Sequence, residues 1–171
     1  MAAILLLLTF SSATSARIGE TISSFKAKNK NKYKFTGIVV QDEKKSYNFN
    51  LLLDSAKLKT APGFGAGMSV NVKKGKITGE SLAISLGQNA VAGHELAVDA
   101  ACDFISDTIV RPPLDPDKKQ QERGLVSQAI FLAFAGKAQE LKFPGSEKKI
   151  VFRRNLRGYM LIKVLDKESK K

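Results

Sequence analysis

The chain has 171 residues, of which 43% are hydrophobic and 26% are charged. This composition excludes a disordered or fibrous chain and is typical of a single globular domain. Lysine and arginine total 28 against 16 acidic residues, and the resulting net charge of +12 favours anionic partners.

The N-terminus combines an apolar run, Ala2 to Phe10, with small residues up to Ala16. This layout is typical of an export signal, and the run is too short to span a bilayer. We therefore expect a signal peptide at residues 1–16, a single domain at 17–171, and a periplasmic or secreted location. A buried first strand or helix is the alternative.

Strand patterns follow this segment. Residues 33–40 are rich in β-branched and aromatic side chains, the sequence QDEKK predicts a hairpin turn, and residues 47–53 alternate between apolar and polar. Residues 58–60 are a third candidate strand. Strands are expected again from about 70 to 86, with a turn at Lys74 and Gly75.

The glycine-rich sequence GFGAG at 63–67 predicts a turn between strands, since it lacks the context of a nucleotide-binding loop. The surrounding stretch 61–68 is apolar throughout. As an exposed loop with lysines at its rim it would suit an anionic membrane or a partner's groove. Folding inward is the alternative.

Helical spacing of apolar residues predicts two helices, at about 89–110 and 116–141. Asp115 is suited to cap the second, and Pro116 to occupy its first position. Two strands are expected around residues 155–158. The fold class is therefore α+β: an antiparallel sheet with the two helices packed on one face and the C-terminal strand pair rejoining the sheet.

An acidic stripe runs along the first predicted helix at successive i+4 positions. Its members are Glu95, Asp99, Asp103 and Asp107. One row on one helix cannot surround a cation, because hard cations take oxygen ligands from several directions. We expect the stripe to be solvated or paired with the chain's own lysines, and we expect no metal and no cofactor.

Residues 79–83, GESLA, resemble the GxSxG nucleophile elbow. The motif requires a helix directly after the serine, but the strand pattern here continues through Leu86. A serine hydrolase using Ser81 and His94 is therefore a minor alternative. We expect no catalytic residue: His94 lies at a helix start, and Cys102, the only cysteine, is expected to be a small buried hydrophobe.

The basic residues gather mainly in the predicted strands, including KAKNKNKYK at 26–34, which has a lysine at every even position. We expect Lys32 and Lys34 on the solvent side of a strand, with residues 26–30 as a looser, extended approach to it. Arginines in a hairpin suit planar anions. The candidate anion-binding residues are Lys26, Lys28, Lys30, Lys32, Lys34, Arg153, Arg154 and Arg157. They form a joint site only if the arginines lie on the same face as the lysines.

Together these features predict an exported, non-enzymatic binding or accessory protein. Its basic sheet surface would engage an anionic partner: an envelope polymer, a lipid headgroup or an acidic protein. Sequence-specific nucleic-acid binding is not expected, because the strands lack the aromatic pattern that stacks bases. The alternative is a carrier that holds a small apolar ligand between sheet and helices.

Overall fold

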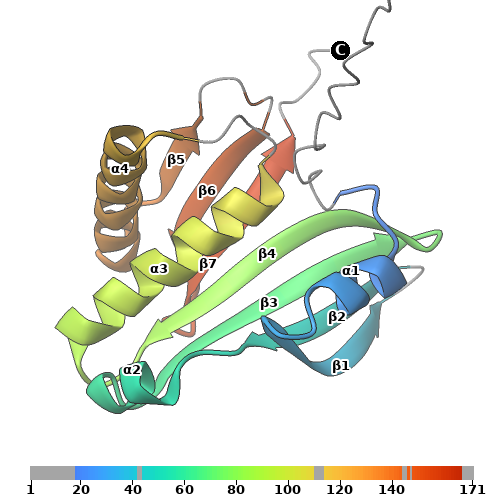
Figure 1. Ribbon diagram of the computed structural model, residues 1–171, viewed down its shortest axis with the longest axis horizontal. Helices are drawn as coiled ribbons and strands as arrows, with labels where there is room; N and C mark the ends of the chain where they lie inside the picture. The colour runs from blue at the N-terminus through green and yellow to red at the C-terminus, as the bar shows by residue number, and fades with distance from the viewer. Residues whose placement is uncertain (1–17, 42–43, 110–113, 144–145, 147, 167–171) are drawn as a thin grey trace, which may run out of the picture.

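One antiparallel sheet organises the chain. The computed structural model describes residues 18–41, 44–109, 114–143, 146 and 148–166, and the predicted signal peptide lies outside them. Within these residues seven strands form one sheet in the order β1-β2-β3-β4-β7-β6-β5 (Figure 1). The strands are β1 Tyr33–Gln41, β2 Lys44–Leu51, β3 Phe64–Lys73, β4 Lys76–Leu86, β5 Gln139–Lys142, β6 Lys148–Arg154 and β7 Met160–Asp166.

Two meanders build this sheet, and they meet between β4 and β7. The first contains β1 to β4 in chain order, and the second contains β5 to β7. Ser81 of β4 pairs with Lys163 of β7, so the C-terminal strands rejoin the sheet as predicted. All neighbouring strands are antiparallel. The predicted α+β fold with an antiparallel sheet is confirmed.

The sheet has a buried inner face and a more exposed outer face. Every second residue of β3 from Phe64 to Val72 is buried. Residues directly opposite each other in antiparallel strands share a face. One inner-face row that crosses six strands consists of Phe35, Phe49, Met68, Leu82, Ile162 and Phe152.

The helices are α1 Ile22–Lys28, α2 Ser55–Thr60, α3 Ala90–Thr108 and α4 Pro116–Phe134. Figure 1 shows α1 and α3 in front of the sheet. Both contact inner-face residues: Phe25 of α1 packs on Phe49, and Thr108 of α3 donates a hydrogen bond to the Glu80 carboxylate at 3.4 Å. Helix α4 packs against α3 and β6. Among the described residues, no helix has the length and apolar character needed to cross a bilayer.

Helix α4 begins as predicted but ends earlier. The Asp115 side chain accepts a hydrogen bond from the Lys118 N–H at 2.8 Å, which caps the first turn. The helix ends at Phe134 rather than 141, because Gly136 adopts a left-handed φ of 84°. The Lys137 N–H then donates to the Leu132 carbonyl at 2.9 Å, which completes a Schellman motif. Residues 139–142 form β5 instead.

Three short predictions were wrong. Residues 58–60 belong to α2 rather than a strand, because Asp54 caps a helix there through the Ala56 N–H at 2.8 Å. Residues 26–28 lie in α1 rather than in an extended approach to β1. Residues 64–67 belong to β3, where Phe64 and Ala66 are buried. The stretch 61–68 is therefore largely part of the core and not an exposed apolar loop.

Candidate anion-binding site

Helix α1 holds part of the lysine-rich segment against the sheet. The Thr21 hydroxyl accepts a hydrogen bond from the Ser24 N–H at 3.3 Å and so caps the helix. Phe25 is fully buried, and its ring centroid lies 5.2 Å from that of Phe49 and 6.1 Å from that of Tyr33. This aromatic packing fixes α1 over β1 and β2.

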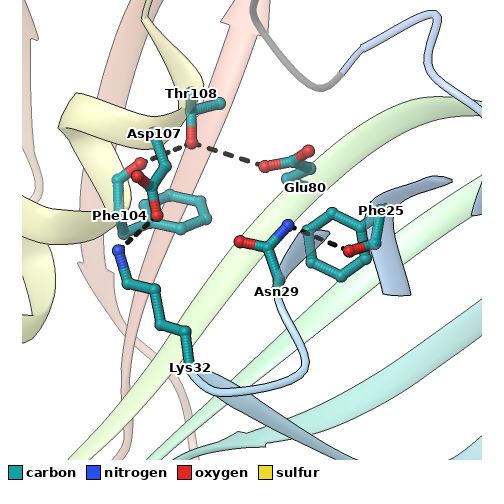
Figure 2. A network of polar contacts seen from close by, with 7 residues as sticks. All are labelled: Phe25, Asn29, Lys32, Glu80, Phe104, Asp107 and Thr108. Atoms are coloured by element: carbon teal, nitrogen blue, oxygen red, sulfur yellow. Dashed lines mark hydrogen bonds and ion pairs between the residues drawn. The ribbon is translucent and has the colours of Figure 1, made fainter. Parts of the chain in front are cut away.

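The segment between α1 and β1 is held at two points (Figure 2). Asn29 Nδ2 donates to the Phe25 carbonyl at 2.9 Å, and the Asn29 backbone N–H donates to the same carbonyl at 3.1 Å, so Asn29 closes the last turn of α1 twice. Lys32 forms an ion pair with Asp107 near the end of α3. The Lys32–Asp107 pair joins the start of β1 to α3, and the two contacts together restrict the position of Lys30, which lies between them.

The five lysines from 26 to 34 divide into two sets. Lys28 pairs with Glu20 at 2.7 Å between Nζ and Oε1, and Lys32 pairs with Asp107. The other three line a single pocket and form no ion pair within the described residues: Lys26, Lys30 and Lys34. Carboxylates of the chain therefore compensate two of the five charges and leave three available to a ligand.

This lysine pocket has a volume of about 300 Å³ and an aromatic floor. Among the residues that the structure describes, no acidic side chain lines it. The lining residues are Phe25, Lys26, Asn29, Lys30, Tyr33, Lys34, Phe35 and Phe49. Of the four aromatic residues, Phe25, Tyr33 and Phe49 are buried, whereas Phe35 is 42% exposed.

Lys26 is already placed by aromatic contacts. Its Nζ lies 3.8 Å from the ring centroid of Phe35 and 5.0 Å from that of Tyr47. Cation–π attraction of this kind holds an ammonium group beside the rings. Because this side chain is already held in place, an anion that binds to it causes a smaller loss of side-chain conformational entropy.

The charge balance of the pocket favours an anion. Lys26, Lys30 and Lys34 line one small volume, although Lys34 belongs to the outer face of β1, and like charges held near one another repel. A bound anion would remove this repulsion and accept charge-assisted hydrogen bonds. Among the described lining residues, a cation would meet the amide oxygen of Asn29, backbone carbonyls and aromatic rings, but no carboxylate.

The arginines of the predicted site lie far from this pocket. They belong to β6 and the turn after it, and β2, β3, β4 and β7 separate β6 from β1. Arg154 donates to the Phe134 carbonyl at 3.2 Å, at the end of α4. Arg157 lies in the turn, where its N–H donates to Asn155 Oδ1 at 3.0 Å.

Arg153 shares a sheet face with Lys34, whereas Lys26 of the same segment lies over the rings of the inner face. Successive strand pairings run from Lys34 through Asn50, Gly67, Ala83 and Leu161 to Arg153, so both ends of this row lie on the outer face. Five strand spacings of ~4.8 Å separate them by about 24 Å. The lysines and arginines therefore do not form one compact site.

The acidic stripe of α3 is paired in part, as expected. Asp107 binds Lys32, and Asp99 binds Arg123 of α4 at 2.5 Å and Lys57 of α2 at 3.4 Å. Among the described residues, no group of three or more His, Cys, Asp or Glu side chains is placed to hold a metal ion. The stripe thus links α3 to the elements around it.

Ser81 and His94 are not brought together. Ser81 pairs with Ser69 and Lys163 on the outer face, whereas α3 packs on the inner face. His94 Nε2 instead lies 2.9 Å from Ser127 Oγ of α4. Burial lowers the pKa of His94, and the nearby Glu95 opposes this shift to a smaller extent. The contact joins two helices.

Cys102 is half-buried against the core. Desolvation raises the pKa of its thiol to about 11, mainly because burial disfavours the thiolate. The thiol is therefore protonated at neutral pH and is a poor nucleophile. The expectation of a small buried hydrophobe holds only in part, since Cys102 packs against the core but is half-buried.

Sequence reasoning missed the aromatic floor. A lysine at every second position indicates an extended chain. The same series also places lysines four residues apart, which is the spacing of one helix face. The signals for α1 were the Thr21 cap and the apolar pair Ile22 and Phe25 three residues apart. Together they would have placed Phe25 against the sheet and the lysines around it.

Comparison with known proteins gives no further guide, because the chain matches no protein-family model, no curated protein and no solved structure.

Proposed function

We propose that this protein is a non-enzymatic binding protein that engages an anionic group in the lysine pocket. One observation carries the proposal. Three lysines that form no ion pair within the described residues line one pocket, whereas Lys28 and Lys32, which alternate with them in the sequence, pair with Glu20 and Asp107. A surface that only kept the protein soluble would have no reason to gather these three charges around buried rings.

The test is calorimetric titration with inorganic pyrophosphate at low and at physiological ionic strength. In the first variant, Lys26, Lys30 and Lys34 are replaced by glutamine. We expect the affinity to fall at least about tenfold, since each charge-assisted hydrogen bond contributes ~1.5–3 kcal/mol. Far-UV circular dichroism checks that the variant is folded.

A matched control removes the same charge elsewhere. Lys59, Lys119 and Lys137 are exposed and do not line the pocket, and their replacement by glutamine lowers the net charge equally. We expect this control to bind almost as the natural chain does. Equal losses in both variants, or no binding of the natural chain at physiological ionic strength, would reduce the interaction to nonspecific charge.

The alternative carrier would hold an apolar ligand between the sheet and the second long helix. That region contains fully buried side chains from both layers, including Ile130 of α4 and Phe152 of β6. No specific observation favours a ligand there, so the lysine pocket remains the site of our proposal.

Export is part of the proposed function. The apolar run and small residues at 1–16 support it, although they lie outside the described residues. N-terminal sequencing of protein from the exported fraction tests it, with cleavage after Ala16 expected. An intact Met1 in that fraction would contradict cleavage.

A further inference from the structure

We propose that the ligand of the lysine pocket is an anionic amphiphile, with its acidic head on the lysines and its apolar part on the aromatic floor and along β1. This inference rests on the proposed function. It adds the chemical class of the ligand.

The first observation is the floor itself. A site for a small inorganic anion needs donors and charge, whereas this pocket also presents the rings of Phe25, Tyr33, Phe35 and Phe49. Pockets lined by aromatic side chains with a few polar groups are suited to ligands that are partly apolar. Because lysines and aromatic residues line the same pocket, one ligand could place a charged head on the lysines and an apolar segment on the rings.

The second observation is an apolar strip that leaves the pocket along β1. Phe35, Ile38 and Val40 are 42%, 49% and 63% exposed. Their partners on β2 are Phe49, Tyr47 and Lys45, which alternate along that strand and so share the inner face. The strip therefore continues the aromatic floor without changing sides.

A β-bulge makes this continuity possible. Phe35 and Ile38 are three residues apart, and in a regular strand an odd separation would place them on opposite faces. The register of β1 shifts between Phe35 and Gly37, which returns Ile38 to the face of Phe35. Because of the bulge, the exposed side chains of Phe35, Ile38 and Val40 form one continuous surface on the edge strand β1.

Size and charge agree with a chain-bearing ligand. From Phe35 to Val40 the strand covers roughly 15 Å, the length of an extended alkyl chain of about twelve carbons. The three unpaired lysines are near one end of this strip, and Val40, beside Lys45, is at the other. A head with a single acidic group at the lysine pocket and an extended aliphatic tail over Ile38 and Val40 fits this length, and Lys45 then lies beside the end of the tail.

The experiment compares dodecyl phosphate, below its micelle concentration, with inorganic pyrophosphate and with the uncharged dodecyl maltoside. We expect dodecyl phosphate to bind at least about tenfold more tightly than pyrophosphate, because burial of methylene groups adds to the charge contact. Dodecyl maltoside should bind weakly or not at all. Vesicles of phosphatidylglycerol, with phosphatidylcholine as reference, test the same chemistry in a bilayer.

Two pairs of substitutions locate the tail. Ile38→Ser with Val40→Ser should remove the advantage of dodecyl phosphate and leave pyrophosphate binding unchanged. Val91→Ser with Leu125→Ser alters two aliphatic side chains in α3 and α4 that are at least as exposed, 77% and 53%, and should change neither.

The outcomes separate the two proposals. Absence of pyrophosphate binding and of dodecyl phosphate binding overturns the proposed function. Pyrophosphate binding without a gain for dodecyl phosphate or for anionic vesicles overturns only the inference, as does a gain that survives the Ile38 and Val40 substitutions. Tight binding of monomeric dodecyl phosphate identifies a free amphiphile as the source, and binding confined to anionic vesicles identifies a membrane lipid.

Discussion

Two glycines in helices of equal length should respond oppositely to alanine. Gly93 lies in the first turns of α3 and Gly124 in the middle of α4. On helix propensity alone, each replacement by alanine would stabilise the fold by up to about 1 kcal/mol. The structure predicts this gain only for Gly124, where an added Cβ would meet nothing within 4 Å.

At Gly93 the same methyl group would collide with β4. An ideal Cβ there would lie 1.9 Å from the Leu86 carbonyl oxygen, 1.5 Å short of the 3.4 Å at which ordinary contact begins. The obstacle is backbone, which cannot rotate away, so α3 must move off the sheet. Overpacking costs ~1–3 kcal/mol and occasionally more. The severity of this backbone clash calls for the upper end of that range, about 3 kcal/mol; after subtraction of the propensity gain of about 1 kcal/mol, we expect Gly93→Ala to destabilise the protein by about 2 kcal/mol.

The assay is thermal and urea unfolding followed by far-UV circular dichroism. For a chain of this length ~1 kcal/mol corresponds to about 2–4 °C. We expect a melting temperature lowered by roughly 4–8 °C for Gly93→Ala and raised by roughly 2–4 °C for Gly124→Ala. A Gly93→Ala variant as stable as the natural chain would refute the close approach of α3 to Leu86.

Three further predictions concern single side chains. Because burial lowers the pKa of His94 below its ordinary 6.5, the unfolded chain binds the proton more tightly, so stability should fall as the pH drops below that value. Urea midpoints measured from pH 7 to 5 should show a smaller fall in His94→Gln, and equal slopes would contradict this. With the pKa of its thiol at about 11, Cys102 should react with iodoacetamide at pH 8 roughly a hundredfold more slowly than in urea-unfolded protein; comparable rates would exclude the shift. Asp99 is 38% exposed although it binds Arg123 and Lys57, so Asp99→Asn should cost less than about 1 kcal/mol in urea unfolding, and a larger loss would show that the pairs are shielded from solvent.

Much of the sheet could be predicted, because its strands alternate clearly. Residues 47–51 place apolar and polar side chains on opposite faces, and the Lys74–Gly75 turn has the positive φ values, 50° and 78°, that such a hairpin requires. The start of α4 could be predicted for a similar reason, since Asp115 and Pro116 act locally. Where the local sequence pattern favours only one secondary structure, tertiary packing seldom changes it.

The errors arose where one signal has two interpretations. The lysines from 26 to 34 fit both a period of two and an i+4 spacing, and only the packing of Phe25 against Phe49 decides for a helix. GFGAG was assigned to a turn because glycine is common there, although Phe64, Ala66 and Met68 alternate as in a strand. Apolar residues continue past Phe134 and favour a longer α4, but the left-handed Gly136 ends the helix.

The pocket could not be predicted in the same way. Its lining comes from α1, β1 and β2, and the compensation of Lys32 depends on Asp107, 75 residues further along the chain. No local pattern carries that information. The sequence pattern indicates the lysine segment that lines the pocket, but the separation of the arginines depends on the strand order, which places β6 far from β1.

The join between β4 and β7 also bears on how the chain folds. Strands β1 to β4 can pair with sequence neighbours through short connections, whereas Ser81 and Lys163 meet only after a loop of about 80 residues has closed. Contacts of that range slow folding, and prior formation of α3 and α4 would shorten the span to be searched. The N-terminal meander, which carries the lysine pocket, should therefore acquire amide-exchange protection before Leu161 and Lys163 do during refolding.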